Sequence, residues 1–320
     1  MYKTSIALIL GNGFDKDLGL ASSYPEFARS VEWENLFNSF WGTRFSNWFM
    51  SNSLLWHLKK AIKPNWFEIE EEIHNFILEH PKITKKQEHN IQQEFEGLKL
   101  ALSEYLNRIS REFKANKEKL AYQLLCHLPK CPVHIVEISF NYTNPDLFID
   151  TNDKIDFVNI FHCTRTHVHG SLNEADIVLG CDIQDKEVVN RPLSFMYKYN
   201  MLKRANFVAL TLLEAKEIIF FGHSVNEMDF CCFREFFKMV SASPKPFRNL
   251  TFITWDEKSE RDIKDNIRNQ GVSVTDLYNN LFSLTFIHSS KIYNGDYDEN
   301  EKWKDLLFRL QHQTHQETEL

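Results

Sequence analysis

The chain lacks the features that would place it in several special classes. No apolar run is long enough to cross a bilayer, and the first residues show no secretory signal pattern. The six cysteines form no Cys-x-x-Cys pair, which favours free thiols over a disulfide framework. With 37 basic and 44 acidic side chains the net charge is −7, so no general attraction to nucleic acid is expected. These absences predict a cytoplasmic globular protein without a membrane segment.

What is present is the composition of an ordinary folded protein. Hydrophobic residues make up 43% of the 320 residues and charged residues 25%, enough for a substantial core. Strand-like runs occur near the start and after residue 130, whereas residues 30–130 carry aromatic and aliphatic side chains at helical spacing. We therefore expect a Rossmann-like α/β domain formed by 1–29 and 131–320, with an inserted all-α subdomain at 30–130. Its sheet should be mostly parallel, with helices on both faces.

The expected strands and helices are short and well separated. The strands are expected at 5–10, 133–140, 155–161, 166–169, 177–179, 217–221, 249–255 and 281–288. The clearest expected helices are 87–113, 227–240 and 257–270.

A glycine turn follows the first apolar run and is the strongest local signal. The run ends in Gly11-Asn12-Gly13-Phe14-Asp15, where two glycines let backbone approach the phosphates or ribose of a nucleotide. The spacing is not the full dinucleotide fingerprint. A tight turn without a ligand is the alternative interpretation of this motif alone.

Three other expected strands also lead into polar or glycine-containing ends. In open α/β sheets, ligands bind outside the carboxyl ends of the strands, so these ends are expected to converge on one site. The motifs are residues 141–143, 168–171, and 222–224 with Asp229. The predicted nucleotide-contacting residues are Gly11, Asn12, Gly13, Phe14, Ser171, Gly222, Ser224 and Asp229.

The order of these motifs resembles the bacterial abortive-infection AbiH family over about residues 5–230. The resemblance rests on GNGFD with Gly19-Leu20 and Ser23-Tyr24, on Phe140-Asn141-Tyr142-Thr143, on His167-Val168-His169-Gly170, and on Gly222-His223-Ser224 ahead of Asp229. Trp66 with Glu70 is similar to the tryptophan–acid element of that family. More distantly, the motif order resembles the sirtuin-like domains of antiphage proteins, which bind NAD and in several cases hydrolyse it.

The sirtuin-like resemblance implies catalytic roles for two residues and a ligand role for the glycine turn. The catalytic amide and histidine fall on Asn141 and His169, and the ribose- and phosphate-contacting turn falls on the GNGFD segment with Asp15. Two positions depart from the sirtuin-like pattern. Thr143 stands where that pattern has Asp, and GNGFD replaces a Gly-Ala-Gly-type turn.

The chemistry of NAD cleavage fits these residue types. Breaking the N-glycosidic bond develops positive charge on the ribose, while nicotinamide leaves as a neutral group. The reaction needs a carboxamide to orient water or a ribose hydroxyl, a base that titrates near neutral pH, and a dry pocket. Asn141 supplies the first group and His169 the second. Asp15 would hold the ribose hydroxyls or stabilise the developing cation.

Structural roles are the alternatives for each of these residues. Asn141 also suits a turn at a strand end, and His169 also suits a hydrogen-bonded core histidine. The neighbouring histidines His162, His167 and His169 suggest a zinc site. No Cys or His pair at ligand spacing completes the set of ligands, so no metal is predicted. Ser224 lacks the second glycine of a nucleophile elbow, and with Asp229 it is expected to cap the following helix. The carboxylates at 68–72 suit a solvated helix face, with Glu70 turned inward.

The resulting hypothesis is a phage-defence effector that binds NAD and hydrolyses it to release nicotinamide, with no tightly bound cofactor. The first alternative is a nucleotide-binding sensor without turnover, in which the helical insertion binds a phage-derived or accessory protein. The second alternative is a nuclease or RNA-directed toxin. The sequence leaves the trigger, the choice between NAD and NADP, and homo-oligomer formation open.

Overall fold

The computed structural model describes residues 5–41, 52–62, 68–149, 163–174, 176–181, 191–198 and 201–312. The chain forms two compact units. The sheet unit comprises Met1–Leu20, Lys114–Val168 and Met201–Leu320, and the helical unit comprises Ala21–Phe113 and His169–Asn200. Residues 21–29 and 169–200 therefore group with the helices, and 114–130 group with the sheet, unlike the division expected from the sequence.

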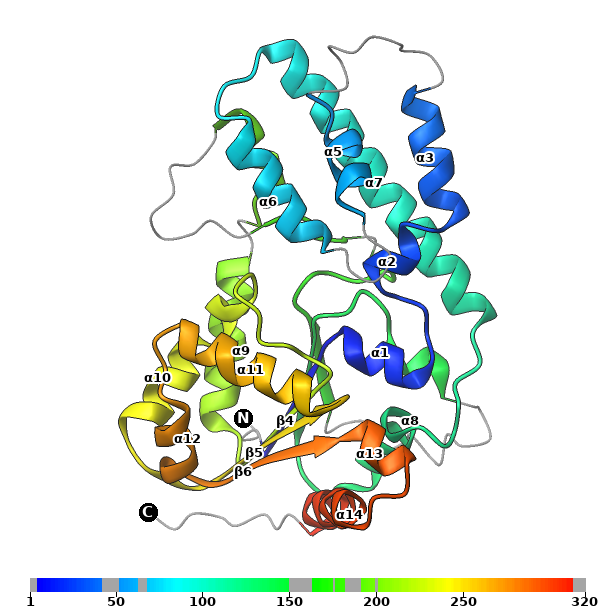
Figure 1. The fold of residues 1–320 in the computed structure, drawn as a ribbon. Helices are drawn as coiled ribbons and strands as arrows, with labels where there is room; N and C mark the ends of the chain where they lie inside the picture. The colour runs from blue at the N-terminus through cyan, green and yellow to red at the C-terminus, as the bar shows by residue number, and fades with distance from the viewer. Residues whose placement is uncertain are drawn as a thin grey trace. The chain divides into compact units, whose positions relative to one another are not determined.

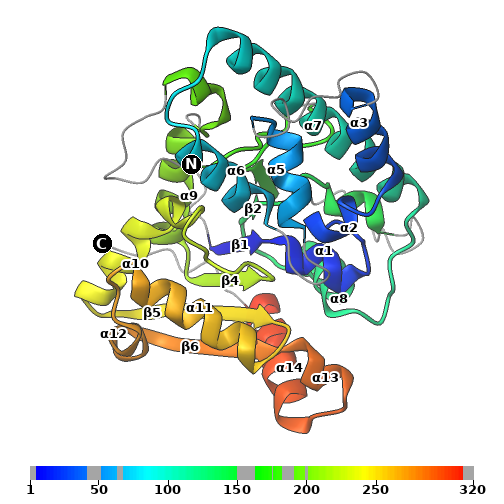
Figure 2. The same cartoon turned by 45° about the horizontal axis from the view of Figure 1, so that its top comes forward.

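The sheet unit contains one six-stranded sheet whose order is β3-β2-β1-β4-β5-β6. Figure 2 shows β2, β1, β4, β5 and β6 in this order. Every neighbouring pair in this sheet is parallel. The chain builds outward from β1 to β2 and β3, and then continues on the other side of β1 with β4, β5 and β6. This is the strand order of a Rossmann fold, so the expected Rossmann-like α/β class is confirmed. The reversal of direction lies between β1 and β4.

The strand bounds match most of the expected runs. The strands are β1 Ile6–Leu10, β2 Ile135–Ser139, β3 Cys163–His167, β4 Glu217–Phe221, β5 Lys245–Thr254 and β6 Leu281–His288. The run at 281–288 is confirmed residue for residue, and the third strand begins before its expected start at 166. The strand expected at 177–179 is wrong, because these residues lie in a loop in which Val178 N donates to the His169 carbonyl at 2.7 Å. The run at 155–161 lies outside the described residues.

Helices cover the sheet because its central strands are apolar on both faces. Every residue of β1 is buried, as expected for a strand in the middle of a parallel sheet. Alternate residues such as Ala7, Ile9 and Phe220 join one aromatic-rich core with side chains from α9 to α12. The helices of this unit are α1 Asn12–Leu18, α8 Leu120–His127, α9 Met201–Glu214, α10 Arg234–Ala242, α11 Glu257–Asn269, α12 Val274–Asn280, α13 Ser289–Tyr293 and α14 Tyr297–Gln311.

The helical unit is built around one long helix. Helix α7, Lys85–Glu112, begins at a capping box formed by Thr84 and Gln87, and it buries a stripe that includes Phe95, Leu98 and Leu102. The other helices of the unit are α2 Tyr24–Phe27, α3 Val31–Trp41, α5 Leu54–Ala61 and α6 Ile69–Glu79. Figure 1 shows α3, α5 and α7 side by side, consistent with the contacts between them. The short helix Arg191–Met196 also packs on α7, which explains why residues 169–200 belong to this unit.

Candidate functional site

The glycine turns after β1 and β4 pack directly on each other. Gly11 N donates to the Phe221 carbonyl at 3.0 Å, and Gly13 N donates to the Gly222 carbonyl at 2.9 Å. A Cβ on Gly11 or Gly13 would lie 2.6 Å from backbone atoms of the partner turn, and one on Gly222, whose φ is +65°, would lie 2.3 Å from Gly13 C. The requirement for glycine is therefore met by contact between two turns of the protein itself. The Phe14 side chain is fully buried and packs edge-on against Phe221, so it is a core residue.

The turn after β4 continues into a strained residue. Val225 has a φ of +53° although it is β-branched and fully buried. Its N–H donates to His223 Nδ1 at 2.9 Å, so this ring nitrogen carries no proton. His223 Nε2 faces Asp229 Oδ2 at 3.7 Å, and both side chains are buried. Strained backbone held by a buried polar pair is often associated with a functional site.

Neither Ser224 nor Asp229 caps a helix as expected. Helix α10 begins at Arg234, with Phe233 at its N-cap position, and not at residue 227 where the expected helix 227–240 starts. Asp229 precedes a short 3₁₀ segment without a side-chain capping bond, and Ser224 is exposed. The Ser224 carbonyl accepts a hydrogen bond from Asn266.

Three polar residues form a buried cluster, here called the Asp15 cluster, at the ends of β1 and β2. Asn141 Nδ2 donates to Asp15 Oδ1 at 2.9 Å and to the Gly11 carbonyl at 3.0 Å. Thr143 Oγ1 donates to Asp15 Oδ2 at 2.6 Å. The three side chains are almost fully buried, and both N–H donors of the amide are used inside the protein. Only Oδ1 of Asn141 is left to accept a hydrogen bond from a ligand.

The cluster explains the departure at position 143. The Thr143 hydroxyl donates to the Asp15 carboxylate, which an ionised aspartate at this position could not do. A second carboxylate at that distance would repel the first. Asn141 and Thr143 therefore both act as hydrogen-bond donors to Asp15, the aspartate of the glycine turn.

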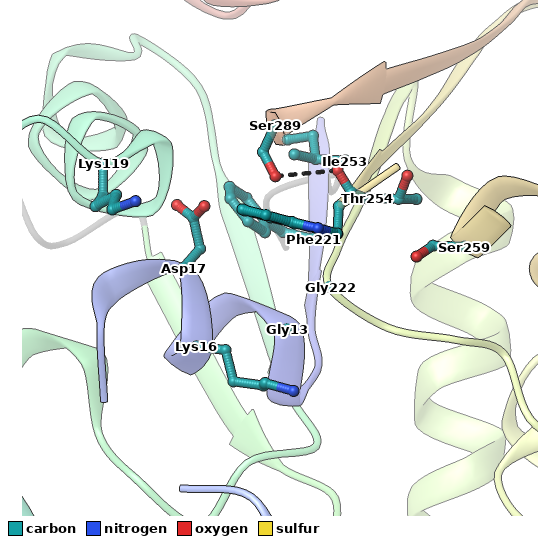
Figure 3. Close-up of a pocket in the computed structure, with 11 residues that line it drawn as sticks. Gly13, Lys16, Asp17, Lys119, Phe221, Gly222, Ile253, Thr254, Ser259 and Ser289 are labelled. Atoms are coloured by element: carbon teal, nitrogen blue, oxygen red, sulfur yellow. Dashed lines mark hydrogen bonds between the residues drawn. The ribbon is translucent and has the colours of Figure 1, made fainter. Parts of the chain in front are cut away.

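A pocket of about 500 Å³ lies at the carboxyl ends of β1, β4, β5 and β6, where the strand order reverses. Figure 3 shows Lys119 and Asp17 on one side of the pocket and Thr254 and Ser259 on the other. The pocket is lined by Gly13, Lys16, Asp17, Lys119, Phe221, Gly222, Ile253, Thr254, Trp255, Ser259 and Ser289. It therefore combines two cationic side chains, several hydroxyls and an apolar floor. Ligand sites in open α/β sheets occur at this position.

Asp17, at the edge of the pocket, is held by groups from distant parts of the chain. Tyr293 Oη donates to Asp17 Oδ1 at 2.6 Å, and Ala121 N donates to Oδ2 at 2.9 Å. Burial raises the pKa of the Asp17 carboxyl, although these two donors and nearby Lys119 act in the opposite direction. Burial and the adjacent carboxylate raise the pKa of Tyr293. Lys119 Nζ lies 4.0 Å from the centre of the Tyr293 ring.

His169 and Ser171 belong to the helical unit, whereas the Asp15 cluster belongs to the sheet unit. His169 is buried, and its Nε2 lies 3.4 Å from Nζ of Lys198. Lys198 in turn forms an ion pair with Glu70 at 2.6 Å. Ser171 N donates to Asp176 Oδ1 at 2.7 Å, and Gly170, with a φ of +79°, turns closely over the Asp176 backbone. The proximity of Asn141 and His169 stays a prediction.

Among the other predicted residues, Asn12 is exposed at the start of α1, and Glu70 is buried as expected. His162 and Trp66 lie outside the described residues. Within the described part of the chain, no three His, Cys, Asp or Glu side chains are grouped so that they could hold a metal ion. Sequence reasoning gave no role to Thr143, His223 or Lys198. Thr143 and His223 lie inside the motifs at 141–143 and 222–224, but no motif in the sequence marks Lys198.

The fold and the pocket define a Rossmann-like α/β protein with a ligand-type pocket at the switch point of its sheet. The family model described as Bacteriophage abortive infection AbiH matches residues 7–247, so the chain belongs to the AbiH family. No curated protein and no solved structure matches the chain. Among the helices of the described residues, none has the length and apolar character needed to cross a membrane.

Proposed function

We propose that this AbiH-family protein acts in defence against phage by binding NAD and cleaving its N-glycosidic bond, which releases nicotinamide. The observation that carries the proposal is that the pocket and the Asp15 cluster both lie at the carboxyl ends of strands of one sheet, next to the β1–β4 switch point. The glycine turn that holds Asp15 also lines the pocket, through Gly13. Dinucleotides bind across such a switch point in Rossmann folds. The motif-level resemblance to sirtuin-like antiphage domains supports the choice of NAD.

The lining of the pocket suits the phosphate and adenosine portion of the ligand. Lys16 and Lys119 supply positive charge for phosphate oxygens, while Ser259 and Ser289 offer hydroxyls for hydrogen bonds. Trp255 lines the pocket with more than half of its surface exposed, so its indole is available to stack on a base.

The Asp15 cluster suits the reacting end of the ligand. Asn141 Nδ2 donates to Asp15 and to the Gly11 carbonyl, which fixes the amide and leaves Oδ1 as its remaining acceptor. A fixed acceptor of this kind would orient a ribose hydroxyl or the attacking water. The negative charge on Asp15 favours the cationic ribosyl group that develops as the bond breaks. Nicotinamide leaves as a neutral group, so little acid assistance is needed.

The decisive experiment is incubation of the purified protein with NAD, NADP and ATP, followed by identification of products by mass. We expect nicotinamide and ADP-ribose from NAD, with at least a tenfold loss in the Asn141→Ala and Asp15→Asn variants. Asn269→Ala, a change at an exposed residue of α11, serves as the matched control and should keep full activity. Unchanged nicotinamide release in the Asn141 and Asp15 variants would show that these roles are wrong.

A nucleotide sensor without turnover is the second candidate. The observation that favours it is that the donors of Asn141 and the two oxygens of Asp15 are already engaged inside the protein, as in a purely structural cluster. Calorimetry would then detect binding of NAD or ADP-ribose while the mass analysis finds the ligand intact. Metal-dependent loss of RNA with NAD unchanged would instead support the RNA-directed toxin. A protein partner for the helical unit stays a prediction.

A further inference from the structure

Three charged or titratable side chains from distant segments meet inside the helical unit. Glu70 lies in the first turn of α6, His169 lies at the start of the second segment of the unit, and Lys198 follows the short helix Arg191–Met196. Their exposed fractions are only 8%, 5% and 3%. Long charged side chains are almost never buried to this extent unless they are paired. We call these residues the Lys198 cluster.

The backbone around Lys198 is held in place independently of its side chain. Lys198 N donates to the Cys181 carbonyl at 2.9 Å, and Cys181 N donates to the Met196 carbonyl at 3.0 Å. Gly180 makes this approach possible, since a Cβ there would lie 2.2 Å from the Met196 carbonyl oxygen. These backbone hydrogen bonds therefore fix the position from which the Lys198 side chain extends to Glu70 and His169.

The charges of the Lys198 cluster determine the direction of its hydrogen bonds. Lys198 Nζ lies 2.6 Å from Glu70 Oε1, and the lysine side chain has no exposed surface, so the pair is an ammonium and a carboxylate. An ammonium has three donors and no lone pair. The nitrogen that faces it at 3.4 Å, His169 Nε2, must then accept the hydrogen bond.

We infer that Lys198 and Glu70 hold the His169 imidazole in the neutral tautomer that carries its proton on Nδ1. A protonated imidazole would place a second positive charge beside the ammonium, without a lone pair to accept from it. A neutral imidazole with the proton on Nε2 would point one donor at another. Lys198 and Glu70 are thus positioning residues for His169.

This assignment changes the expected chemistry of His169. Neutral imidazole has a single basic lone pair, and here it is occupied by the hydrogen bond from Lys198. His169 therefore has no free lone pair with which to act as a general base, and its one N–H is on Nδ1. This catalytic meaning rests on the proposed function, but the tautomer does not.

Nitrogen NMR of the full-length protein labelled with ¹⁵N-histidine tests the inference without any ligand. The His169→Gln variant identifies the His169 signals by their loss. We expect Nε2 of His169 to resonate as an unprotonated nitrogen and Nδ1 as a protonated one. A protonated Nε2 in the wild-type protein overturns the inference, whatever any variant does.

Variants then test whether Lys198 is the cause. Lys198→Met should shift the His169 signals away from the Nδ1–H tautomer, whereas Lys198→Arg, which keeps a cationic donor, should retain it. Lys82→Met removes an exposed lysine of the same unit and should leave the signals unchanged. If Lys198→Met does not fold because Glu70 is left unpaired, the double variant with Glu70→Gln removes that charge as well. Unchanged His169 signals in the folded variant overturn the inference.

The two proposals fail separately. A protein that consumes no dinucleotide but shows the Nδ1–H tautomer contradicts the proposed function and leaves this inference standing. Nicotinamide release together with a protonated Nε2 does the reverse.

Discussion

Thr143→Val and Thr251→Val are the same chemical change, and we expect them to shift stability in opposite directions. Both threonines are almost fully buried in the sheet unit, with exposed fractions of 1% and 0%. Each substitution replaces a hydroxyl by a methyl of similar size. The two sites differ in one respect, which is the presence of a hydrogen-bond acceptor.

The Thr143 hydroxyl donates to the Asp15 carboxylate at 2.6 Å. Losing a hydrogen bond to a charged group lowers the free energy of unfolding by about 1.5–3 kcal/mol, because the buried acceptor is left short of a donor. Thr251 Oγ1, in the middle of β5, has no hydrogen-bond partner among the described residues. Removing a buried, unsatisfied hydroxyl is expected to raise the free energy of unfolding by about 1 kcal/mol. The two variants should therefore differ by roughly 2.5–4 kcal/mol.

Urea unfolding at pH 7, followed by circular dichroism and tryptophan fluorescence, measures this difference. The slope m should be unchanged, so the midpoint alone reports the change in stability. The double variant of Thr143→Val with Asp15→Ala should show strong non-additivity, because the two residues share one hydrogen bond. A neutral Thr143→Val variant, or a Thr251→Val variant destabilised by more than about 1 kcal/mol, would refute the reasoning.

Three further predictions concern the glycine turn and two carboxylates. Gly222→Ala should prevent folding or lower the melting temperature steeply, because its Cβ would meet backbone at 2.3 Å; Gly295→Ala, also at positive φ but with nothing within 4 Å, should cost only about 1–2 kcal/mol. Burial raises the pKa of Glu217, so Glu217 contributes stability that is lost as the pH rises from the usual glutamate pKa through the higher native-state pKa. Glu217→Gln should remove this contribution, which pH-dependent urea titrations would show as a smaller loss of stability on raising the pH. Hydrogen bonding to Arg108 lowers the pKa of Glu32, so the pair stabilises the protein above the usual glutamate pKa, and this contribution is lost as pH falls through the native-state pKa. Arg108→Met should cost about 0.5–1 kcal/mol at pH 7 and nothing near pH 2, and an equal loss at both would contradict the assignment.

Local patterns in the sequence were sufficient for most of the sheet. The apolar runs that became β1 and β4 are short and bounded by polar or glycine residues, and such runs form buried strands wherever helices cover both faces. Helix α11 was predictable for the same reason, since its apolar positions recur at helical spacing and Asp256 caps its first turn. The strand predicted at 177–179 was wrong because a run of only three apolar residues also suits a partly buried loop.

The sequence by itself determined the Rossmann-like class and the residues that stand at the strand ends, because those depend on local periodicity and turn chemistry. The meaning of these residues was decided only by the tertiary structure. The turns that hold Gly11 and Gly222 pack on each other. Thr143 donates a hydrogen bond to Asp15, although the two residues are 128 positions apart in the sequence. The contact of Lys198 with His169 could not be predicted from any motif in the sequence, because a hydrogen bond inside a folded unit depends on distance in space and not on spacing along the chain.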